Sequence, residues 1–411
     1  MTDRTWIAGV GMTPFAVHPE HSGHDLARWA VREALADAGD AQVSDIDIAF
    51  YGNITDGALQ GQHTIPGQIA LRGMELQTVP VYNVENACAT GSTALNLAAM
   101  AVRAGEADIA LAVGAEKMNI DDRARTMALF DSGYDVSNPA ALVKILEELG
   151  GAVDDADLGT RSIFMDIYAA WTRNHMRLFG TTQEHLAAVS SKNHGHAVDN
   201  PRAHFRMKMS VDEVLSARPL SYPLTVPMCS PTTDGGAAVI VCNDEGLRRL
   251  GAEHPVELLA SIIGSGSDRD ISTFEGHLAG KAAARAYERA GVGPDDVDVA
   301  EVHDATAFGE ILQSELLGLV PPGEGGPAAA RGETTIGGRI PINPSGGLES
   351  KGHPLAATGL GQVFELTEQL RGRAGSRQVE GARIAIAENG GGFHNGEEAA
   401  ASVVILGRSP A

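Results

Sequence analysis

The chain has 411 residues, of which 43% are hydrophobic, and its formal net charge is −22. This length and composition suffice for one large core or for two halves that share a core. Because nucleic acids and anionic membranes bind basic surfaces, the charge argues against both as partners and requires any polyanionic ligand to meet a local basic cluster.

Compartment and cysteine use can be inferred from short stretches. The start, MTDRTWIAGVGMTPF, lacks the long apolar segment of a signal peptide, and no apolar run is long enough to span a bilayer. The three cysteines, Cys88, Cys229 and Cys242, lack metal-ligand spacing, which argues against disulfide bonds and against a zinc site. We therefore expect a cytoplasmic α/β protein without a bound metal.

The first elements alternate between strand and helix. The apolar run Thr5–Val10 predicts a strand, and helical spacing of apolar residues predicts a helix over Asp25–Ala38, ended by a glycine. The alternating run Ile46–Tyr51 predicts a second strand. Residues Gly52–Gly73 are rich in Gly and Gln, and we expect a loop there.

Cys88 lies between a predicted strand and a predicted helix. The run Val79–Val84 predicts the strand, the small residues of Thr93–Arg103 predict the helix, and Ile109–Val113 predicts a buried strand after it. Unpaired backbone N–H groups and the positive end of the helix dipole favour a thiolate at such a turn. Cys88 is therefore a candidate nucleophile; the alternative is a small buried apolar residue, the usual role of a free cysteine.

Residues 119–218 differ from the flanking sequence and predict a mostly helical insert. Scattered charges and several Met and His residues replace the buried-strand pattern. Helical stretches span Ala140–Leu149, Ser162–Phe179 and Gln183–Ala197.

The densest positive cluster of this acidic chain lies in the segment NPRAHFRMKMS. It holds Arg202, Arg206 and Lys208. The cluster is either an ordinary solvated surface or a phosphate contact for a nucleotide-bearing ligand, for which Arg and Lys are suitable donors.

The second half of the chain repeats the pattern of the first. After strands predicted at 237–242 and 255–263, the helix Lys281–Ala290 and the strand in DDVDVAEVHD match the predicted elements at 25–38 and 46–51. The stretch GGLESKGHPLAATGLGQVFELTEQL, followed by ARIAIAENGGG, repeats the turn, small-residue helix and buried strand of the Cys88 unit. The repeat is too long for a solenoid. It predicts two duplicated α/β halves around a pseudo-twofold axis, with both turns facing one cleft.

Three histidines of the second half lie at predicted turns. His353 begins the helix equivalent to the one after Cys88, His303 follows a strand, and His394 lies in GGGFHNG before the predicted strand Ala401–Leu406. Imidazole can accept the proton of a thiol, and ligand sites of α/β proteins gather at strand ends. A single histidine is more often structural, but these three together with Cys88 predict a shared catalytic site.

The motifs NACATG, HDATAFGE, GHPLAATG, GGGFHNG and MCSPTTDGGAA resemble those of the thiolase superfamily, and the likeness covers essentially the whole chain. HDA in place of Asn-Glu-Ala, and His-Asn-Gly in place of the second Cys-x-Gly, make it most similar to the sterol-carrier-protein-type, or lipid-transfer-protein, thiolases. The resemblance implies a duplicated thiolase fold of five α-β-α-β-α layers. Its expected parts are an N-terminal half at 1–118 plus 219–250, a loop domain at 119–218 and a C-terminal half at 251–411.

The resemblance also implies a role for each motif residue. Cys88 is the expected nucleophile, and its backbone N–H and that of Gly396 are the expected oxyanion hole. His353 is expected to activate the cysteine, and His303 stands where a water-holding Asn, or its His replacement, belongs. Contacts with coenzyme A are expected from Ser230, which matches a serine that contacts pantetheine, and from Arg202, Arg206 and Lys208 in the loop domain.

This chain lacks the second cysteine that thiolases use as an acid/base. Ala305 and His394 occupy its two expected positions, and Cys229 and Cys242 lie in other motifs. The acid/base step therefore falls to His394 or His303. The departure favours an unusual substrate, a bulky, branched or aromatic 3-oxoacyl-CoA, cleaved with CoA through an acyl-cysteine.

Two other functions fit the same resemblance. A thiolase-like retro-aldolase would cleave a 3-hydroxyacyl-CoA without an acyl-cysteine, although the intact NACATG argues against it. A non-catalytic acyl-CoA-binding subunit is the third reading. In each case the resemblance implies no permanently bound cofactor, coenzyme A or its thioesters as ligands, a homodimer and, as in some relatives, a small OB-fold, zinc-bearing partner subunit.

Overall fold

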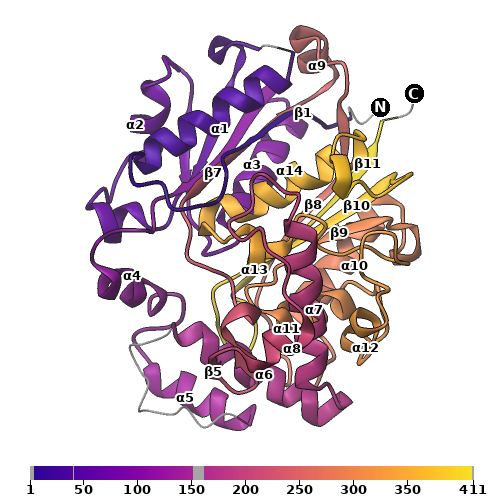
Figure 1. Cartoon of the computed structure of the whole chain (residues 1–411). Coiled ribbons are helices and arrows are strands. Elements are labelled where there is room, and N and C mark those ends of the chain that lie inside the picture. Colours follow the sequence, from indigo (N-terminus) through magenta and orange to yellow (C-terminus); the bar gives the residue numbers. More distant parts are fainter. Residues whose placement is uncertain (1–3, 40, 151–161, 410–411) are drawn as a thin grey trace.

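The fold is built on a nine-stranded mixed sheet. The computed structural model describes residues 4–39, 41–150 and 162–409 (Figure 1). From one edge to the other, the strands are β3 (Val81–Val84), β2 (Ile48–Gly52), β4 (Ile109–Glu116), β7 (Gly235–Cys242), β1 (Trp6–Met12), β8 (Val256–Ser265), β11 (Ala400–Arg408), β10 (Ile384–Gly391) and β9 (Val299–Glu301).

Apart from β3, which has no counterpart, the pairing pattern is the same on both sides of the sheet's centre, where β1 and β8 pair antiparallel. Outward from β1, β7 is antiparallel to β1, β4 is antiparallel to β7, and β2 is parallel to β4. Outward from β8, β11 is antiparallel to β8, β10 is antiparallel to β11, and β9 is parallel to β10. This palindromic order confirms the predicted duplication of two α/β halves.

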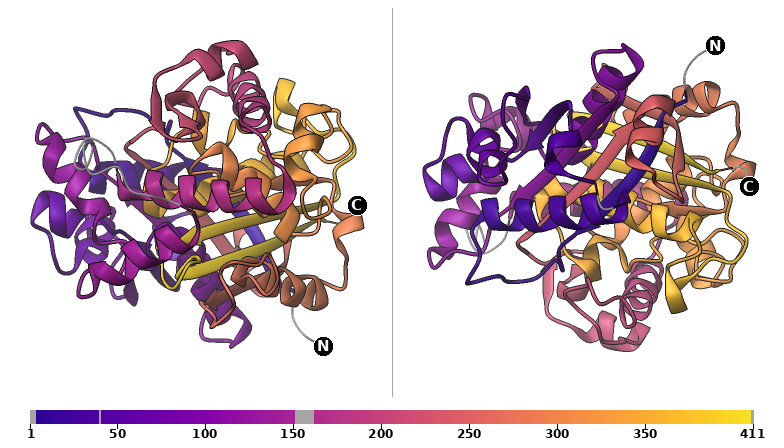
Figure 2. Two further views of the ribbon diagram at one scale, coloured as in Figure 1. Left: turned by 90° about the horizontal axis from the view of Figure 1, so that it is seen from below. Right: turned by 90° about the horizontal axis from the view of Figure 1, so that it is seen from above.

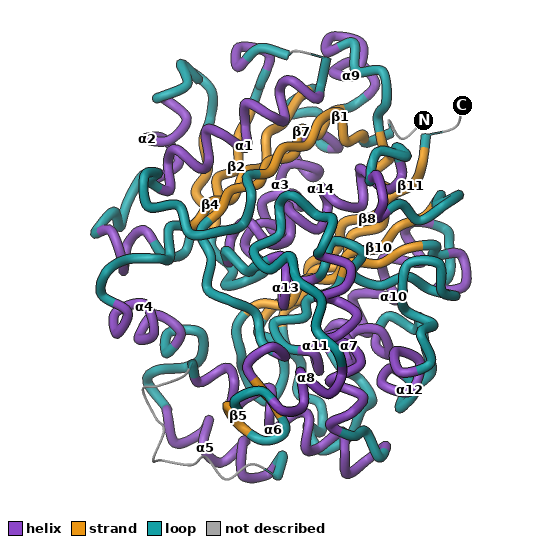
Figure 3. The backbone as a smooth tube through the Cα atoms, viewed as in Figure 1, coloured by secondary structure: helices purple, strands orange, loops and turns teal. Residues whose placement is uncertain are grey.

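Helices cover both outer faces and fill the space between the halves. Helix α1 (Gly23–Asp37) packs on β1 and β7, and α10 (Leu278–Ala290) packs on β8 and β11. Helices α3 (Thr90–Arg103) and α14 (Thr358–Leu370) pack on each other between the two groups of strands (Figure 3). The resulting order of layers is α-β-α-β-α, as predicted.

Small residues allow the central helices to approach closely. A Cβ atom on Gly91 of α3 would lie 2.4 Å from the carbonyl oxygen of Ala356, and one on Gly359 of α14 would lie 1.9 Å from Ser92 Oγ. Helix α14 is almost wholly buried because it has layers on both sides. By contrast, α1 begins at a Ser22–Asp25 capping box and buries one face only.

The predicted helical insert contains α4 (Arg123–Phe130), α5 (Pro139–Glu148), α6 (Ile163–Phe179), α7 (Gln183–Ala197) and α8 (Val211–Ser216), followed by the short pair β5 (Pro219–Ser221) and β6 (Leu224–Thr225). Its apolar residues share one buried cluster with residues of the second half. Helix α7 packs on α11 (Ala307–Leu316), α12 (Gly325–Ala330) and α13 (Gly347–Lys351). The pink helices around α7 stand out from the body formed by the strands (Figure 2).

One predicted loop is wrong. Residues 52–73 contain helix α2 (Pro66–Arg72) and a single wide turn at Asp56–Gln60. The guanidinium of Arg28, on α1, donates to the carbonyl oxygens of Ala70 and Ile69 at 2.9 and 3.2 Å. This long-range contact satisfies the end of a seven-residue helix whose Gly- and Gln-rich composition predicts none.

The remaining helix of the described ranges longer than one turn is α9 (Asp244–Leu250). Among the described residues, none of the helices combines the length and the apolar character needed to cross a bilayer.

Candidate active site

Cys88 lies on the turn between β3 and α3. The N–H of Asn86 donates to Thr90 Oγ1 at 2.8 Å, and the Asn86 side-chain amide donates to Thr93 Oγ1 at 3.0 Å. Ala87 adopts a left-handed φ of 46°, unusual for a residue with a Cβ atom. The turn therefore has one conformation, which presents the thiol at the first turn of α3.

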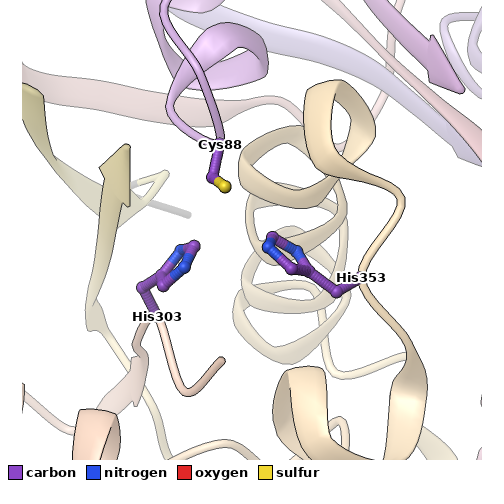
Figure 4. Close-up of side chains that lie close together, drawn as sticks. All are labelled: Cys88, His303 and His353. Carbon is purple, nitrogen blue, oxygen red and sulfur yellow. The ribbon is translucent and has the colours of Figure 1, made fainter. Parts of the chain in front are cut away.

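His303 and His353 come from the second half and meet Cys88 across the centre of the molecule. His303 follows β9, and His353 lies between α13 and α14. One ligand atom from each residue of this triad lies within 4.8 Å of the other two, and the imidazole centroids are 5.0 Å apart at 85° (Figure 4). The turn that carries Cys88 and the turn that carries His353 therefore meet at one site, as predicted.

Hydrogen bonds assign the tautomer of His353. Its Nδ1 lies 2.7 Å from Thr358 Oγ1, and that hydroxyl donates its single proton to the carbonyl oxygen of Pro354 at 3.1 Å. Thr358 can therefore only accept from the imidazole, so Nδ1 carries the proton. Nε2 of His353 is left with a lone pair, which can accept the thiol proton.

His303 has the opposite tautomer. Ser92 Oγ donates to Asn389 Oδ1 at 2.9 Å, which orients the amide so that its Nδ2 donates to His303 Nδ1 at 2.8 Å. Nδ1 is thus an acceptor, and the proton of the neutral ring lies on Nε2. The site combines one imidazole that accepts a proton with one that donates a hydrogen bond.

Burial keeps all three groups neutral at rest. Burial lowers the pKa of His303 to about 4, and burial, together with the charge of His303, lowers the pKa of His353 well below its usual value. Burial also raises the pKa of the Cys88 thiol to about 12, despite a hydrogen bond from the Gly392 N–H. The expected resting thiolate is therefore wrong, because desolvation outweighs the helix terminus. A nucleophilic thiolate at Cys88 therefore requires a base that takes its proton.

The same three side chains are the one group of His, Cys, Asp and Glu residues in the described ranges whose ligand atoms cluster closely enough to hold a metal ion. Thiolate and imidazole ligands suit zinc. An ion there would bind the lone pair of His353 Nε2, which could then not accept the proton of the Cys88 thiol. That the protein works without a bound metal stays a prediction.

The structure moves the candidate oxyanion hole to another glycine. The backbone N–H groups of Gly392 and of Cys88 itself face Sγ. Gly396 lies elsewhere: its carbonyl oxygen accepts from Trp171 Nε1 at 3.0 Å, and its Cα lies against Ile271. The second N–H group of the candidate oxyanion hole is therefore that of Gly392, and the expectation that Gly396 supplies it is corrected. The run of three glycines that ends β10 was the sequence signal for this position.

His394 does not join the site. It is exposed in a turn in which its N–H donates to the Glu397 carbonyl oxygen at 3.0 Å, and it is absent from the pocket around Cys88. The preceding residue, Phe393, is buried against Trp171, whereas His394 itself is exposed to solvent. The expected acid/base role of His394 is corrected on this ground.

A cavity of about 680 Å³ opens beside Cys88 and includes His303, His353 and Ser230 in its wall. Ser230 is held there by its N–H, which donates to the Ala305 carbonyl oxygen at 3.0 Å. Sequence reasoning missed Glu398, the one carboxylate of this wall, although two adjacent acidic residues shortly before the mainly apolar strand β11 were a signal. Much of the remaining wall is aromatic or thioether, including Met127, Phe130, Phe164, Met165, Trp171 and Met209.

The three predicted phosphate ligands have different environments. Arg202 is engaged within the fold: it forms an ion pair with Glu33 at 3.0 Å, and its guanidinium lies 4.7 Å from the Phe364 ring centroid. Its expected contact with coenzyme A is corrected for that reason. Arg206 and Lys208 are exposed, and Arg218, which sequence reasoning did not single out, lies in the wall of the cavity.

Comparison with known proteins gives consistent matches. A model of the thiolase N-terminal domain matches residues 5–213, and a thiolase C-terminal domain-like model matches residues 267–408. Sterol carrier protein 2 of Oryctolagus cuniculus is 39% identical over 396 residues, which are 94% of this chain and 69% of that protein.

Two further relatives align over nearly their whole length. An acetyl-CoA acetyltransferase of Methanothermobacter thermautotrophicus is 39% identical, covering 94% of this chain and 96% of its own, and benzoylsuccinyl-CoA thiolase subunit BbsB of Thauera aromatica is 34% identical, covering 95% of each. A solved Ltp2-ChsH2(DUF35) aldolase superposes with a TM-score of 0.79 at 23% identity, covering 100% of this chain and 99% of the other. That last likeness shows the fold.

Proposed function

The chain belongs to the thiolase superfamily, in its sterol carrier protein 2 type, and from that premise we propose that it is an acyltransferase that cleaves a 3-oxoacyl-CoA with coenzyme A. One observation carries the proposal: the Cys88 thiol shares a cavity with an imidazole whose free lone pair can take its proton. A retro-aldolase or a passive acyl-CoA-binding subunit has no need of that pair.

The proposed reaction has two stages. His353 accepts the thiol proton as Cys88 Sγ attacks the 3-oxo carbon, and the backbone N–H groups of Cys88 and Gly392 donate to the oxyanion. The bond between C2 and C3 then breaks, and the CoA enolate leaves with its oxygen held by the Nε2–H groups of His303 and protonated His353. A second CoA thiol takes the acyl group from Cys88. Each oxyanion donor contributes about 2.7–4 kcal/mol to transition-state stabilisation.

We place the acyl group in the cavity of about 680 Å³ and propose that it is large and apolar. Aromatic and Met side chains dominate the wall, and Met adapts to irregular apolar shapes. A relative named benzoylsuccinyl-CoA thiolase gives an example of an aromatic acyl group. Bulky, branched and aromatic 3-oxoacyl groups are therefore the substrates to test first.

We also propose that the protein forms a homodimer through the edge of its sheet. Strand β3 ends the sheet on one side, and Tyr82 on that strand is 53% exposed. Nearby apolar side chains at Ile65 and Met100 are similarly exposed. Unpaired strand edges with exposed apolar residues favour pairing with another chain. A small OB-fold partner subunit, as in some relatives, would complement the sparse basic residues near the cavity.

Mass spectrometry of the intact protein after incubation with a panel of 3-oxoacyl-CoAs tests the proposal. We expect an acyl adduct that maps to Cys88 and names the acyl group, and we expect Cys88→Ala to lose both the adduct and cleavage. Cys242→Ala is the matched control, because that thiol is buried within β7, away from the cavity.

The other functions give different results in the same experiment. Full turnover by Cys88→Ala, or cleavage of a 3-hydroxyacyl-CoA without an adduct, would replace the thiolase with a lyase. Tight binding of acyl-CoA with neither adduct nor exchange of labelled CoA would indicate a binding subunit.

A further inference from the structure

The proposed cleavage leaves one step without a residue: the proton that C2 gains when the enolate departs. His394 lies outside the cavity, and neutral His303 could give up its Nε2 proton only by becoming an anion. We propose that Glu398, in the loop between β10 and β11, is the general acid and base at C2. This inference rests on the proposed thiolase function.

Glu398 has the location that this role requires. The residue is 4% exposed and forms part of the cavity wall together with Cys88 and His303. It lies across Gly390: a Cβ atom added there would be 2.8 Å from Glu398 Cγ and 3.5 Å from its Oε1. Gly390 is two residues before Gly392, whose N–H faces the thiol. The missing Cβ therefore leaves room for the carboxyl group against the end of β10, the strand that leads to Gly392.

One oxygen of the Glu398 carboxyl group accepts a hydrogen bond and the other does not. Gln313 Nε2 donates to Oε1 at 2.9 Å. Oε2 is buried and has no hydrogen-bond partner; the nearest group recorded, His277 Nε2, is 3.4 Å away. A buried polar atom without a partner is costly unless a ligand supplies one. A carbon acid or a CoA thiol in the cavity would do so.

The other titratable groups of the wall are less suitable. The Cys229 thiol donates to the Thr225 carbonyl oxygen, and burial raises its pKa further. Burial, with the charges of Glu398 and Cys88, raises the pKa of Tyr168 well above its usual value, which keeps its hydroxyl neutral. His194 Nε2 lies 3.3 Å from the Pro227 carbonyl oxygen, and burial lowers the pKa of this ring.

Burial is the main reason that the pKa of Glu398 lies near neutrality. Burial raises its pKa to about 7, and the charge of Glu397 adds to the rise, while the Gln313 hydrogen bond and the charge of Arg269 oppose it. The other titratable groups near it are His277, Glu388 and Tyr168. An acid/base whose pKa is close to the working pH is present in both forms, which suits a reaction that needs each in turn.

The protons balance over the cycle. Protonated Glu398 gives its proton to C2 as the electron pair of the C2–C3 bond becomes a C–H bond, which yields acetyl-CoA and a carboxylate. The carboxylate removes the proton of the incoming CoA thiol, whose sulfur takes the acyl group from Cys88. The Cys88 thiolate that leaves recovers its own proton from His353.

Exchange of the methyl protons of acetyl-CoA in D2O isolates this step, because it breaks and forms only C–H bonds at C2. We expect Glu398→Gln, which keeps the shape and the Gln313 contact, to slow exchange by about 100-fold or more, the scale of general acid–base catalysis. Acylation of Cys88 by the substrate identified above should persist in intact-mass spectra. In the unsubstituted protein, exchange needs the Glu398 carboxylate, so the exchange rate should rise with pH up to about 7 and then level off. In Glu398→Gln this pH dependence should disappear.

Glu397→Gln is the matched control. Glu397 is also buried, but its carboxylate is occupied by Ser267, by the Leu278 N–H and by Arg269 at 3.1 Å. It should retain exchange within a few fold even if its melting temperature falls. Equal loss in both variants, or unchanged exchange in Glu398→Gln, overturns the inference. Absence of both exchange and a Cys88 adduct in the unsubstituted protein overturns the thiolase function itself.

Discussion

At Cys88, the raised pKa of the thiol and the nearby imidazoles favour proton transfer to a neighbour over a resting thiolate. The thiol of the half-buried Cys88 is neutral at rest, and the two imidazoles around it are held as opposite tautomers by Thr358 and Asn389. A neutral site of this kind costs little desolvation free energy, whereas a buried thiolate without a cation would cost much more. The hydrogen bonds behind the imidazoles therefore decide which ring nitrogen carries the proton.

Thr358→Val tests the tautomer assignment. Without the acceptor at Nδ1, the His353 proton can move to Nε2, where it blocks transfer from Cys88. We expect the rate of Cys88 alkylation by iodoacetamide at neutral pH, and the rate of acylation, to fall by about tenfold or more.

Thr367→Val is the matched control for this change, because Thr367 is buried on the same helix and its hydroxyl has no hydrogen-bond partner. If both variants lose the same activity, or neither does, the tautomer of His353 does not decide the reactivity of Cys88.

At the scale of elements, the contact between α3 and α14 joins the two halves of the site. Gly359 on α14 faces Ser92 on α3, and Ser92 begins the hydrogen-bond chain through Asn389 to His303. The closeness of the two helices therefore sets both the packing of the central layer and the orientation of one imidazole.

Gly359→Ala should separate these helices. Its Cβ would meet Ser92 Oγ at 1.9 Å and Asn389 Oδ1 at 2.6 Å. Overpacking of this kind costs about 1–3 kcal/mol. We expect a lower unfolding midpoint in urea and slower thiol acylation.

Gly361→Ala, on the same helix, provides the comparison. The atoms nearest to its Cβ would be in the Phe15 ring, at 3.0 Å, and Met12 Sδ, at 3.5 Å, which is a much milder contact than the 1.9 Å at Gly359. Alanine also favours a helix over glycine by about 1 kcal/mol. This variant should be nearly as stable as the unsubstituted protein; equal destabilisation of the two would contradict the assigned contact.

At the scale of the whole molecule, the pairing of β1 with β8 brings the carboxyl ends of β3, β9 and β10 towards one central site. Cys88 follows the first, His303 the second, and Gly392 the third. The parallel strands β2 and β3 end at the same edge of the first half, and the parallel strands β9 and β10 end at the same edge of the second. The palindromic strand order brings these two edges together. The same arrangement leaves β3, the strand that leads to Cys88, at the edge of the sheet.

We predict that light scattering after gel filtration will give about twice the chain mass of 42.8 kDa. Tyr82→Lys, which places a charge on the β3 edge, should shift the protein towards monomer and slow cleavage. Val136→Lys is the control, since Val136 is 64% exposed in the insert, far along the chain from β3. A monomer in the unsubstituted protein, or an unchanged dimer in Tyr82→Lys, would reject this interface.

Most elements and the central triad could be predicted from the sequence. Apolar periodicity with glycine stops located the strands and the main helices, and the repeated turn units placed Cys88, His303 and His353 together. These features are local: a residue directly after a buried strand has its position set by that strand's register. Helix α2 is the exception, because its stability depends on Arg28 from another helix.

The protonation state of Cys88 and the residues that the loop between β10 and β11 places in the cavity were decided by the tertiary structure alone. The protonation of Cys88 depends on the amount of water that the second half excludes, which helix position cannot indicate. His394 and Gly396 belong to the right motif, yet His394 is exposed and Gly396 packs against Ile271 and Trp171. Glu398, two residues further on, lines the cavity instead. Arg202 is likewise committed to Glu33 and Phe364. Sequence patterns identify which residues begin and end buried elements, whereas the path of a loop follows from packing against distant residues that no local pattern contains.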